Sequence, residues 1–399
     1  MQDGRVKNVL FVSDPYIEPL LDGIVRFARE HDWALRSLMR RNGKFPSLTK
    51  PDGIVATIEQ AAVLKRLGGL RCPVVQMLDI RNDSRLRYPV VMPDYAALGT
   101  LGAQYLLRLG RPHFAFYRRF DFPDSNAIRD GFERALQAHK CAVIRLDYPS
   151  EYPGLRSGIG EIIPDAQWER ALTAKLRKLP KPCAIMAEDD RWGTQLIRLA
   201  LHSGLRVPQD IAVLGCDNHH PEVDLARVPM SSVDANLSGD GYAAAELLDR
   251  LMHGARVPAG PVIVPPLDVV ARDSTATFVC DDPRLAAVVC RIRRDYAEPL
   301  TIGTLAREAG MSTRSLQVAF RASVGHAVRE EINHCRMQRA AKLLEDTDLK
   351  LAAVAVESGF KEARSLGRIF QHEHGQTPHG FRLAARTRRH THSGESPTS

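Results

Sequence analysis

Near its end the sequence contains one pattern twice, and this repeat limits what the segment can fold into. Residues 300–320 read LTIGTLAREAGMSTRSLQVAF, and residues 349–370 read LKLAAVAVESGFKEARSLGRIF. In each copy, apolar residues at helical intervals precede a glycine, and a second helical run follows a short turn. This is the pattern of a helix-turn-helix, whose second helix enters the major groove of DNA. Two hairpins that only pack are the alternative, but the repeat favours paired DNA-reading units.

The residues at the turns and inside the helices fit this interpretation. Gly310 lies where a positive φ is least costly for glycine, and Ser312 is placed to cap the second helix. The spacing predicts buried side chains at Leu316, Phe320, Leu366 and Phe370. A helix over about 327–344 would join the copies and fix the separation of the reading helices, about 34 Å for one face of B-DNA.

Outward side chains near the start of each second helix are the candidates for reading bases. They are Thr313, Arg314, Gln317 and Val318 in the first copy, and Ala363, Arg364, Gly367 and Arg368 in the second. Arginine matches the acceptors of guanine, and glutamine matches adenine. Arginines that contact only phosphates are the alternative.

The second copy and its exit, GFKEARSLGRIFQHEHGQTPHGFR, resemble the C-terminal signature of AraC-type DNA-binding domains. The residues that carry the resemblance are Gly359, Phe360, Phe370, Gly375, Thr377, Pro378, Phe381 and Arg382. Leu366 departs from the phenylalanine that is frequent in the family. The resemblance implies base contacts at the reading positions named above, with double-stranded DNA as a partner.

Charge is concentrated in the same region. The chain carries a net charge of +8, and residues 284–399 contain 19 Lys and Arg against 12 Asp and Glu. The first 283 residues contain the remaining 36 and 35, so their net charge is only +1. A basic excess at the helix-turn-helix region agrees with phosphate contacts.

The part before the repeat alternates short apolar runs with helical stretches. The apolar runs are 9–12, 53–55, 74–77, 90–92, 114–117, 184–186 and 211–214, and helical stretches include 16–31, 96–109 and 127–139. This alternation is typical of α/β domains with parallel sheets, in which ligands bind beyond the carboxyl ends of the strands.

Polar residues follow several of these runs and form a candidate effector site. They are Asp14, Asp94, Asp189, Asp190, Asp217 and Asn218, with Arg129 at the start of a helix. These side chains supply the hydrogen-bond partners that sugar hydroxyls need. Any one of them alone is more often a helix cap or a loop residue. Their occurrence at successive strand ends favours a binding site.

Four segments of this part resemble the two-lobed, periplasmic-binding-protein-like sensor of LacI/GalR regulators. They are residues 93–117, 129–132, 184–218 and 229–254. Pro93 before Asp94, and Asp189 where the family has asparagine, depart from the pattern. LacI-type proteins begin with their helix-turn-helix, whereas this reader comes last. That order resembles bacterial sugar-operon activators, which implies a pentose such as xylose as effector, with Asp217, Arg129, Asp189 or Asp190, and Asp94 as contacts.

Together the sequence predicts a two-lobed α/β sensor followed by an all-α double helix-turn-helix domain. The expected divisions are a sensor over 1–273, a linker over 274–283, a DNA-binding domain over 284–386 and a disordered tail over 387–399. The expected mechanism is closure of the sensor on a sugar, which repositions the readers of a homodimer and recruits RNA polymerase.

Other classes of protein fit less well. A regulator that responds to a different small molecule stays open, as does an enzyme domain fused to a DNA-binding domain. Against an enzyme, the chain contains no glycine-rich phosphate loop and no GxSxG motif. His219 and His220 are adjacent, a poor arrangement for one metal, and seven scattered cysteines contain no CxxC pair. We expect no cofactor or metal, no membrane span and a cytoplasmic location.

Overall fold

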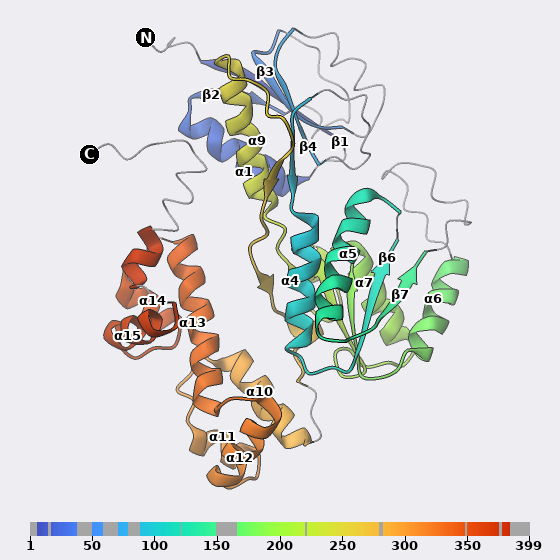
Figure 1. Ribbon diagram of the computed structural model, residues 1–399, viewed down its shortest axis with the longest axis vertical. Coiled ribbons are helices and arrows are strands. Elements are labelled where there is room, and N and C mark those ends of the chain that lie inside the picture. The colour runs from blue at the N-terminus through green and yellow to red at the C-terminus, as the bar shows by residue number, and fades with distance from the viewer. Residues whose placement is uncertain are drawn as a thin grey trace. The chain divides into compact units, whose positions relative to one another are not determined.

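The computed structural model of the chain divides into two compact units, Met1–Thr275 and Ala276–Ser399 (Figure 1). Ser274 and Thr275, at the start of the predicted linker, are buried in the first unit, and Phe278 is buried in the second. The predicted tail lies outside the described residues. The structure describes residues 6–14, 17–37, 50–58, 71–78, 88–119, 121–148, 166–219, 222–278, 282–347, 349–374 and 377–383.

The first unit contains two sheets, each with six strands in the described chain. Sheet A has the order β11-β5-β4-β3-β1-β2 and is parallel throughout. Its strands are β1 (Lys7–Asp14), β2 (Trp33–Arg36), β3 (Gly53–Ile58), β4 (Val74–Met77), β5 (Val90–Pro93) and β11 (Val262–Val264). The apolar runs of β3 and β4 are buried, as expected where helices cover a parallel sheet.

Sheet B has the order β12-β10-β9-β8-β6-β7, and only β12 is antiparallel to its neighbour. Its strands are β6 (His113–Arg118), β7 (Val143–Asp147), β8 (Cys183–Ala187), β9 (Ile211–Cys216), β10 (Ser231–Val233) and β12 (Val269–Val270). Every residue of β8 and β9 is buried, so these two strands form the centre of the lobe.

Pairs of helices pack tightly in both lobes. Helix α1 (Glu18–Glu30) lies against α9 (Leu237–Met252), and α4 (Tyr95–Leu107) lies against α5 (Pro123–Ala138). A Cβ on Gly23 of α1 would lie 1.9 Å from the carbonyl oxygen of Ser238, and one on Gly131 of α5 would lie 2.1 Å from that of Ala96. Glycine is therefore required where the helix backbones touch. Helices α6 (Ala166–Lys178) and α7 (Asp190–His202) contribute to the core of sheet B.

The chain passes between the two sheets three times, at residue 94, at residues 234–236 and at residues 265–268. Hydrogen bonds join these crossing segments. The backbone N–H of Asp94 donates to the carbonyl of Val264 at 2.9 Å, and that of Asp234 donates to the carbonyl of Asp268 at 2.9 Å. The side chain of Asn236 donates to the carbonyl of Pro265 at 3.1 Å. The three segments therefore form one hydrogen-bonded connection between the lobes.

The second unit is helical in the residues that are described. Its helices are α10 (Pro283–Asp295), α11 (Ile302–Glu308), α12 (Thr313–Val324), α13 (Val328–Asp346), α14 (Leu351–Glu357) and α15 (Ala363–His374). Helix α13 is the predicted joining helix, and its buried residues enter two separate cores. Val328 and Ile332 pack with α10 to α12, whereas Met337 and Leu344 pack with α14 and α15.

The longer predicted elements are confirmed, but five short strands were not expected from the sequence. The missed strands are β2, β7, β10, β11 and β12. Most are short, and several mix apolar and polar residues, as in the sequence VIRLD of β7. Strands β10, β11 and β12 have three, three and two residues, which is too few for a hydrophobic pattern to identify them.

Candidate effector site and DNA-reading surface

The acidic candidates lie at the carboxyl ends of strands. Asp14 is the last residue of β1, and Asp94 and Asp217 directly follow β5 and β9. Asp189 is the second residue after β8. Because β8 and β9 are parallel neighbours, Asp189 and Asp217 leave sheet B at the same edge. In open α/β sheets this edge is where ligands bind.

Asp217 differs from Asp94, Asp189 and Asp190, whose carboxylates accept hydrogen bonds from the protein. It is half-buried, and no hydrogen bond from another described residue reaches its side chain. The pKa of Asp217 is raised to about 7, mainly because burial disfavours the charged form and also because the charge of Asp189 repels it, while Arg191 acts in the opposite direction. A ligand hydroxyl would find an available acceptor here.

Asp189 and Asp190 have different roles despite being adjacent. Asp189 caps α7, because one carboxylate oxygen accepts from the N–H of Trp192 at 3.0 Å and the other from Nη2 of Arg191 at 2.7 Å. Asp190 is 2% exposed and accepts from the Ser232 hydroxyl at 2.6 Å and from the N–H of His219 at 2.7 Å. Burial raises the pKa of Asp190 well above its ordinary value. Asp190 therefore holds the segment after β9 against α7 and β10.

Asn218 and Asp94 also have partners within the protein. The Asn218 amide donates to Asp234 at 3.0 Å, and its oxygen accepts from Nη2 of Arg272 at 2.9 Å. Asp94 caps α4 by accepting from the N–H of Ala97 at 2.9 Å. These contacts hold in place the backbone that follows β9 and β5.

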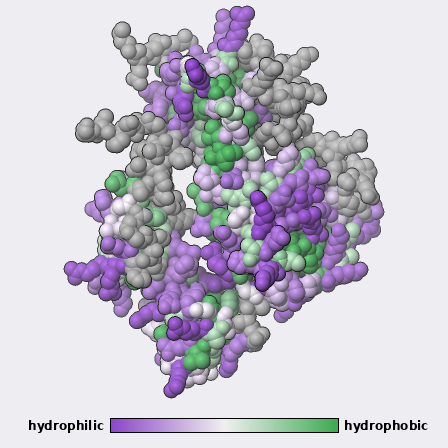
Figure 2. Space-filling view, in the orientation of Figure 1, coloured by the Kyte–Doolittle hydropathy of each residue, from purple (hydrophilic) through white to green (hydrophobic). Residues whose placement is uncertain are grey.

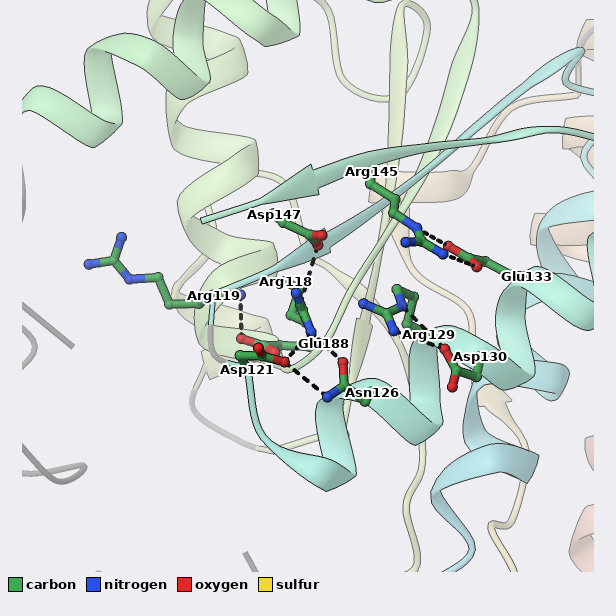
Figure 3. Close-up of polar contacts among 10 residues, drawn as sticks. All are labelled: Arg118, Arg119, Asp121, Asn126, Arg129, Asp130, Glu133, Arg145, Asp147 and Glu188. Atoms are coloured by element: carbon green, nitrogen blue, oxygen red, sulfur yellow. Dashed lines mark hydrogen bonds and ion pairs between the residues drawn. The ribbon is translucent and has the colours of Figure 1, made fainter. Parts of the chain in front are cut away.

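Arg129 lies on α5 in a network of charged side chains (Figure 3). Its Nη2 donates to Asp130 at 3.0 Å, which holds the guanidinium in place on the helix. Nearby, Arg118 donates to Asp121 at 2.7 Å and also to Asn126, which in turn donates to Asp121 at 3.0 Å. The Arg129 side chain is 13% exposed, so a ligand would reach only part of it.

Asp124 is a site residue that the sequence interpretation missed. It lies in the first turn of α5 and accepts from the N–H of Ser125 at 2.8 Å. The pKa of Asp124 is raised, first by burial and also by the charge of Asp189. The pKa of Tyr95 is raised well above its ordinary value by burial and by the charges of nearby carboxylates, Asp124 and Asp217 among them. Asp124, Asp189 and Asp217 therefore lie close enough for their charges to influence one another. The signal was present in Pro123-Asp124, a helix start shortly after a strand.

Asp240 is a second acidic residue that the sequence did not single out. It lies in the first turn of α9 and is 0% exposed. Neither carboxylate oxygen has a hydrogen-bond partner within the described residues. The pKa of Asp240 is raised to about 8, because burial disfavours the anion and because Asp217 carries a charge nearby. Asp240 is therefore protonated in the folded protein at neutral pH.

The two helix-turn-helix motifs have the predicted turns. Gly310, between α11 and α12, has a φ of 62°, and Gly359, between α14 and α15, has a φ of 81°. Ser312 caps α12 by accepting from the N–H of Ser315 at 3.0 Å, as predicted. A Cβ on Gly359 would also lie 2.6 Å from Cα of Ala297, so close packing requires glycine there as well.

The two reading helices bury one face and expose the other. The four predicted core residues Leu316, Phe320, Leu366 and Phe370 are each 0% exposed. On the opposite faces Thr313, Arg314, Gln317, Val318, Arg364 and Arg368 are exposed, whereas Gly367 is half-buried and Ala363 packs against the core of the second motif. Six of the eight predicted base-reading residues are therefore exposed.

An internal ion-pair network anchors α13 at its first turns. Glu331 is 3% exposed and accepts from Nε of Arg293 on α10 at 2.7 Å, and it contacts His326 at 2.8 Å. Although burial raises it, the pKa of Glu331 lies below its ordinary value because Arg293 and His326 favour the anion. Further along α13, Arg336 donates to the carbonyl of Tyr296 at 2.7 Å. These bonds fix α13 relative to α10.

Comparisons with known proteins agree with this architecture. Residues 103–275 match the family model of a periplasmic binding protein-like domain, and residues 305–384 match that of a helix-turn-helix domain. The chain is 25% identical over 343 residues to the xylose operon regulatory protein of Haemophilus influenzae. The aligned region covers 83% of this chain and 85% of that protein. The corresponding protein of Escherichia coli (strain K12) is 26% identical over 336 residues, 83% of each chain.

The chain is a homologue of the xylose operon regulatory proteins. A solved structure of a xylose-binding transcription activator has the same fold, with a TM-score of 0.59 at 20% identity over 96% of this chain and 99% of that one. The predicted fold class is confirmed, and the protein is a transcription regulator that combines a ligand-sensing unit with an AraC-type reader. Within the described residues, no helix is both long and apolar enough to cross a membrane.

The buried carboxyl of Asp240 makes the stability of the protein depend on pH. The pKa of Asp240 is about 8 when folded, against about 3.9 for an unfolded aspartate. Between these values the folded state binds the additional proton, so the free energy of unfolding falls as pH rises, by up to about 1.4 kcal/mol per unit. Asp240→Asn removes this contribution, and we expect the variant to gain stability over the wild type from about pH 5 to 8. Urea unfolding at several pH values measures the difference.

Asp22→Asn is the matched control, because Asp22 is exposed on α1. Its stability curve should follow that of the wild type at every pH. Parallel curves for Asp240→Asn and the wild type would show that Asp240 does not titrate as described.

Proposed function

We propose that the protein is a sugar-responsive activator of a pentose catabolic operon, whose sensor binds xylose or a close relative. One observation carries this proposal. Asp124, Asp189 and Asp217 converge at the carboxyl edge of sheet B, in a chain that also exposes two DNA-reading helices. Its homologues are regulators of xylose operons, and a structurally similar activator binds xylose, which supports this class of effector.

The chemistry of the acidic cluster suits a polyol. Carboxylate oxygens accept hydrogen bonds from neighbouring hydroxyls, and a guanidinium donates to a ring or hydroxyl oxygen. We assign the direct contacts to Asp217, Asp189, Asp124 and Arg129. The remaining predicted effector residues, Asp14, Asp94, Asp190 and Asn218, complete the proposed site, with Asp190 and Asn218 holding the ends of the strands in place.

The mechanism that we propose is closure of the two lobes on the sugar. The direct contacts assigned above come from the lobe of sheet B, so closure requires that the ligand also contact sheet A, where Asp14 ends β1 and Asp94 follows β5. Such a ligand favours the closed state by its differential affinity, and the three crossing segments are where the lobes would rotate. The change would pass through residues 274–283, which we propose as the link to the DNA-binding domain over 284–386. The readers would then bind adjacent half-sites, through the eight positions named above, and recruit RNA polymerase.

Dimerisation is part of this proposal. β11 is an edge strand of sheet A, and Ile263 on it is 46% exposed, while Leu267 after it is 54% exposed. Figure 2 shows hydrophobic surface over the neighbouring helix α9. We propose that a second copy covers this edge, because sheet edges and apolar patches are favoured contact surfaces. A mass of one chain by light scattering at micromolar concentration would contradict the proposal.

Two other functions remain as alternatives. A small molecule other than a pentose could occupy the same acidic site, and the sensor could be an enzyme domain. Among the described residues, no group of three His, Cys, Asp or Glu side chains is arranged to hold a metal ion. The homologues are transcription regulators, which favours a sensor without catalysis. Because DNA is the proposed partner, we propose a cytoplasmic location.

Asp217→Asn tests the sensor. This substitution keeps the shape of the side chain and tolerates the φ of 100° at this position, but it removes the charge that accepts ligand hydroxyls. In a thermal-shift titration with D-xylose we expect the wild type to gain stability with ligand concentration. The variant should need about tenfold or more sugar for the same shift.

Asp22→Asn serves again as the control and should respond to xylose like the wild type. An unchanged response in Asp217→Asn would exclude Asp217 from the site. A wild type that responds to no sugar would overturn the sugar-sensor proposal itself.

Arg368→Ala tests the reading surface. Arg368 is exposed on α15, and loss of a bidentate contact to a base should cost about 1–3 kcal/mol of specific binding. Fluorescence anisotropy with DNA from the region upstream of the regulated operon measures the affinity, with unrelated DNA as the reference for non-specific binding. Arg321→Ala, in the last turn of α12, is the control and should retain specific binding. Equal losses on both DNAs would make Arg368 a phosphate contact.

A further inference from the structure

Arg272 lies near the end of the sensing unit, and the proposed function does not use its side chain. It is the second residue after β12, and Thr275 is the last residue of the unit. Its two terminal nitrogens donate to different partners. Nη1 donates to the carbonyl of Met230 at 2.9 Å, and Nη2 donates to the side-chain oxygen of Asn218 at 2.9 Å. One guanidinium therefore joins the backbone before β10 to the segment after β9.

Asn218 connects Arg272 to the effector site and to the crossing between the lobes. It directly follows Asp217, the carboxylate that we assign to the sugar. The side-chain amide of Asn218 donates to one carboxylate oxygen of Asp234 at 3.0 Å. Asp234 lies in a crossing segment, and its other oxygen accepts from the N–H of Asn236 at 2.9 Å. The contact from Arg272 therefore ends at a residue that both the sugar and the crossing hold in place.

The residues that follow Arg272 are fixed to sheet B. The backbone N–H of Arg272 donates to the hydroxyl of Ser231 on β10 at 2.7 Å, and that hydroxyl lies 2.6 Å from the hydroxyl of Thr275. The Ser274 hydroxyl donates to the carbonyl of Val213 on β9 at 2.6 Å. Ser274 and Thr275 are 0% and 2% exposed. The chain therefore leaves the sensing unit through a segment that cannot rotate independently of the sheet.

Arginine suits a link of this kind. A guanidinium is planar and holds its donors in a fixed fork, so it keeps two acceptors at a defined separation. One acceptor here belongs to the backbone before β10, and the other belongs to Asn218, which is bonded to the crossing. If the crossing bends when the lobes close, the bond between Asn218 and Asp234 transmits that change to one arm of the fork. The other arm holds the exit segment.

We propose that Arg272 couples the effector site to the segment that leads to the DNA-binding unit. It acts as a positioning residue that makes DNA binding depend on the bound sugar, without contacting the sugar. This inference rests on the proposed function, because it names how occupancy of the same site is communicated. The hydrogen-bond relay runs from Asn218 and Asp234 through Arg272 to Ser274 and Thr275, and the second unit begins at the next residue.

The test measures sugar binding and DNA binding with the same full chain. Calorimetry gives the Kd for D-xylose. Fluorescence anisotropy gives the Kd for DNA from the region upstream of the regulated operon, with and without saturating D-xylose. The ratio of the two DNA constants is the coupling factor. We expect it to differ from one by about fivefold or more in the wild type, as is typical of coupled sites.

Arg272→Met removes both arms of the fork and keeps an unbranched side chain. We expect its coupling factor to lie within about twofold of one. Its Kd for D-xylose should stay within about threefold of the wild-type value, because the direct sugar contacts are retained. Arg206→Met is the matched control, since Arg206 is 71% exposed on the same lobe and pairs with Asp210. This control should keep the wild-type coupling factor.

Ser231→Ala is a second variant, and it leaves the Arg272 side chain in place. It removes the hydroxyl that contacts the backbone of Arg272 and the side chain of Thr275, so the exit segment is no longer fixed to β10. The coupling factor should fall here too, with the Kd for D-xylose unchanged. Because the substitution removes a single oxygen, it decides the question if Arg272→Met yields no folded protein.

The possible failures are distinguishable. If either variant keeps the wild-type coupling factor, the relay is wrong and the sugar-sensor proposal stands. If Arg272→Met folds but no longer binds D-xylose, Arg272 belongs to the binding site, and its assignment as a coupling residue is wrong. If the wild type binds no D-xylose, or binds DNA equally with and without it, the proposed function fails as well.

Discussion

The connection between the two lobes is the constraint on which the sensor depends. Three segments far apart in the sequence cross between the sheets, and backbone hydrogen bonds at 2.9 Å join Asp94 to Val264 and Asp234 to Asp268. Because the crossings are tied to one another, a rotation of the lobes would bend them together as one connection. The same segments begin α4 and α9, which pack on opposite lobes. A small rotation at the connection is therefore transmitted to whole lobes, as domain closure requires.

The acidic residues near this connection show how the protein tolerates charge in a buried place. Asp189 and Asp190 are accommodated in different ways: Asp189 pairs with Arg191, whereas Asp190 accepts two hydrogen bonds from the protein and has a raised pKa because of its burial. Asp217 and Asp240 have no such partners in the described residues, and their pKa values rise to about 7 and about 8. Unsatisfied groups of this kind are expected where a ligand supplies the missing partners.

The sequence predicted the scaffold better than the site. Long apolar runs and helical spacing identified the central strands and the reading helices, and Gly310 and Ser312 have their predicted roles because turns and caps are local chemistry. Position after a strand could not distinguish a side chain that faces a ligand from one, such as Asp190, that accepts only protein groups. Asp124 and Asp240 were missed for a related reason. Their importance arises from burial and from neighbours distant in the chain, and neither is encoded in local spacing.

The DNA-binding unit solves a different problem, which is to hold two reading helices rigidly with few residues. Helix α13 takes part in both cores, so the two helix-turn-helix motifs share one structural element instead of a flexible joint. Buried Glu331 and its bond to Arg293 fix the first half of α13, and Arg336 fixes it further along. Because the readers are rigid relative to each other, a signal from the sensor would act by moving the unit as a whole. In the proposed mechanism, regulation would then depend on the placement of an intact reader, which closure of the lobes would change.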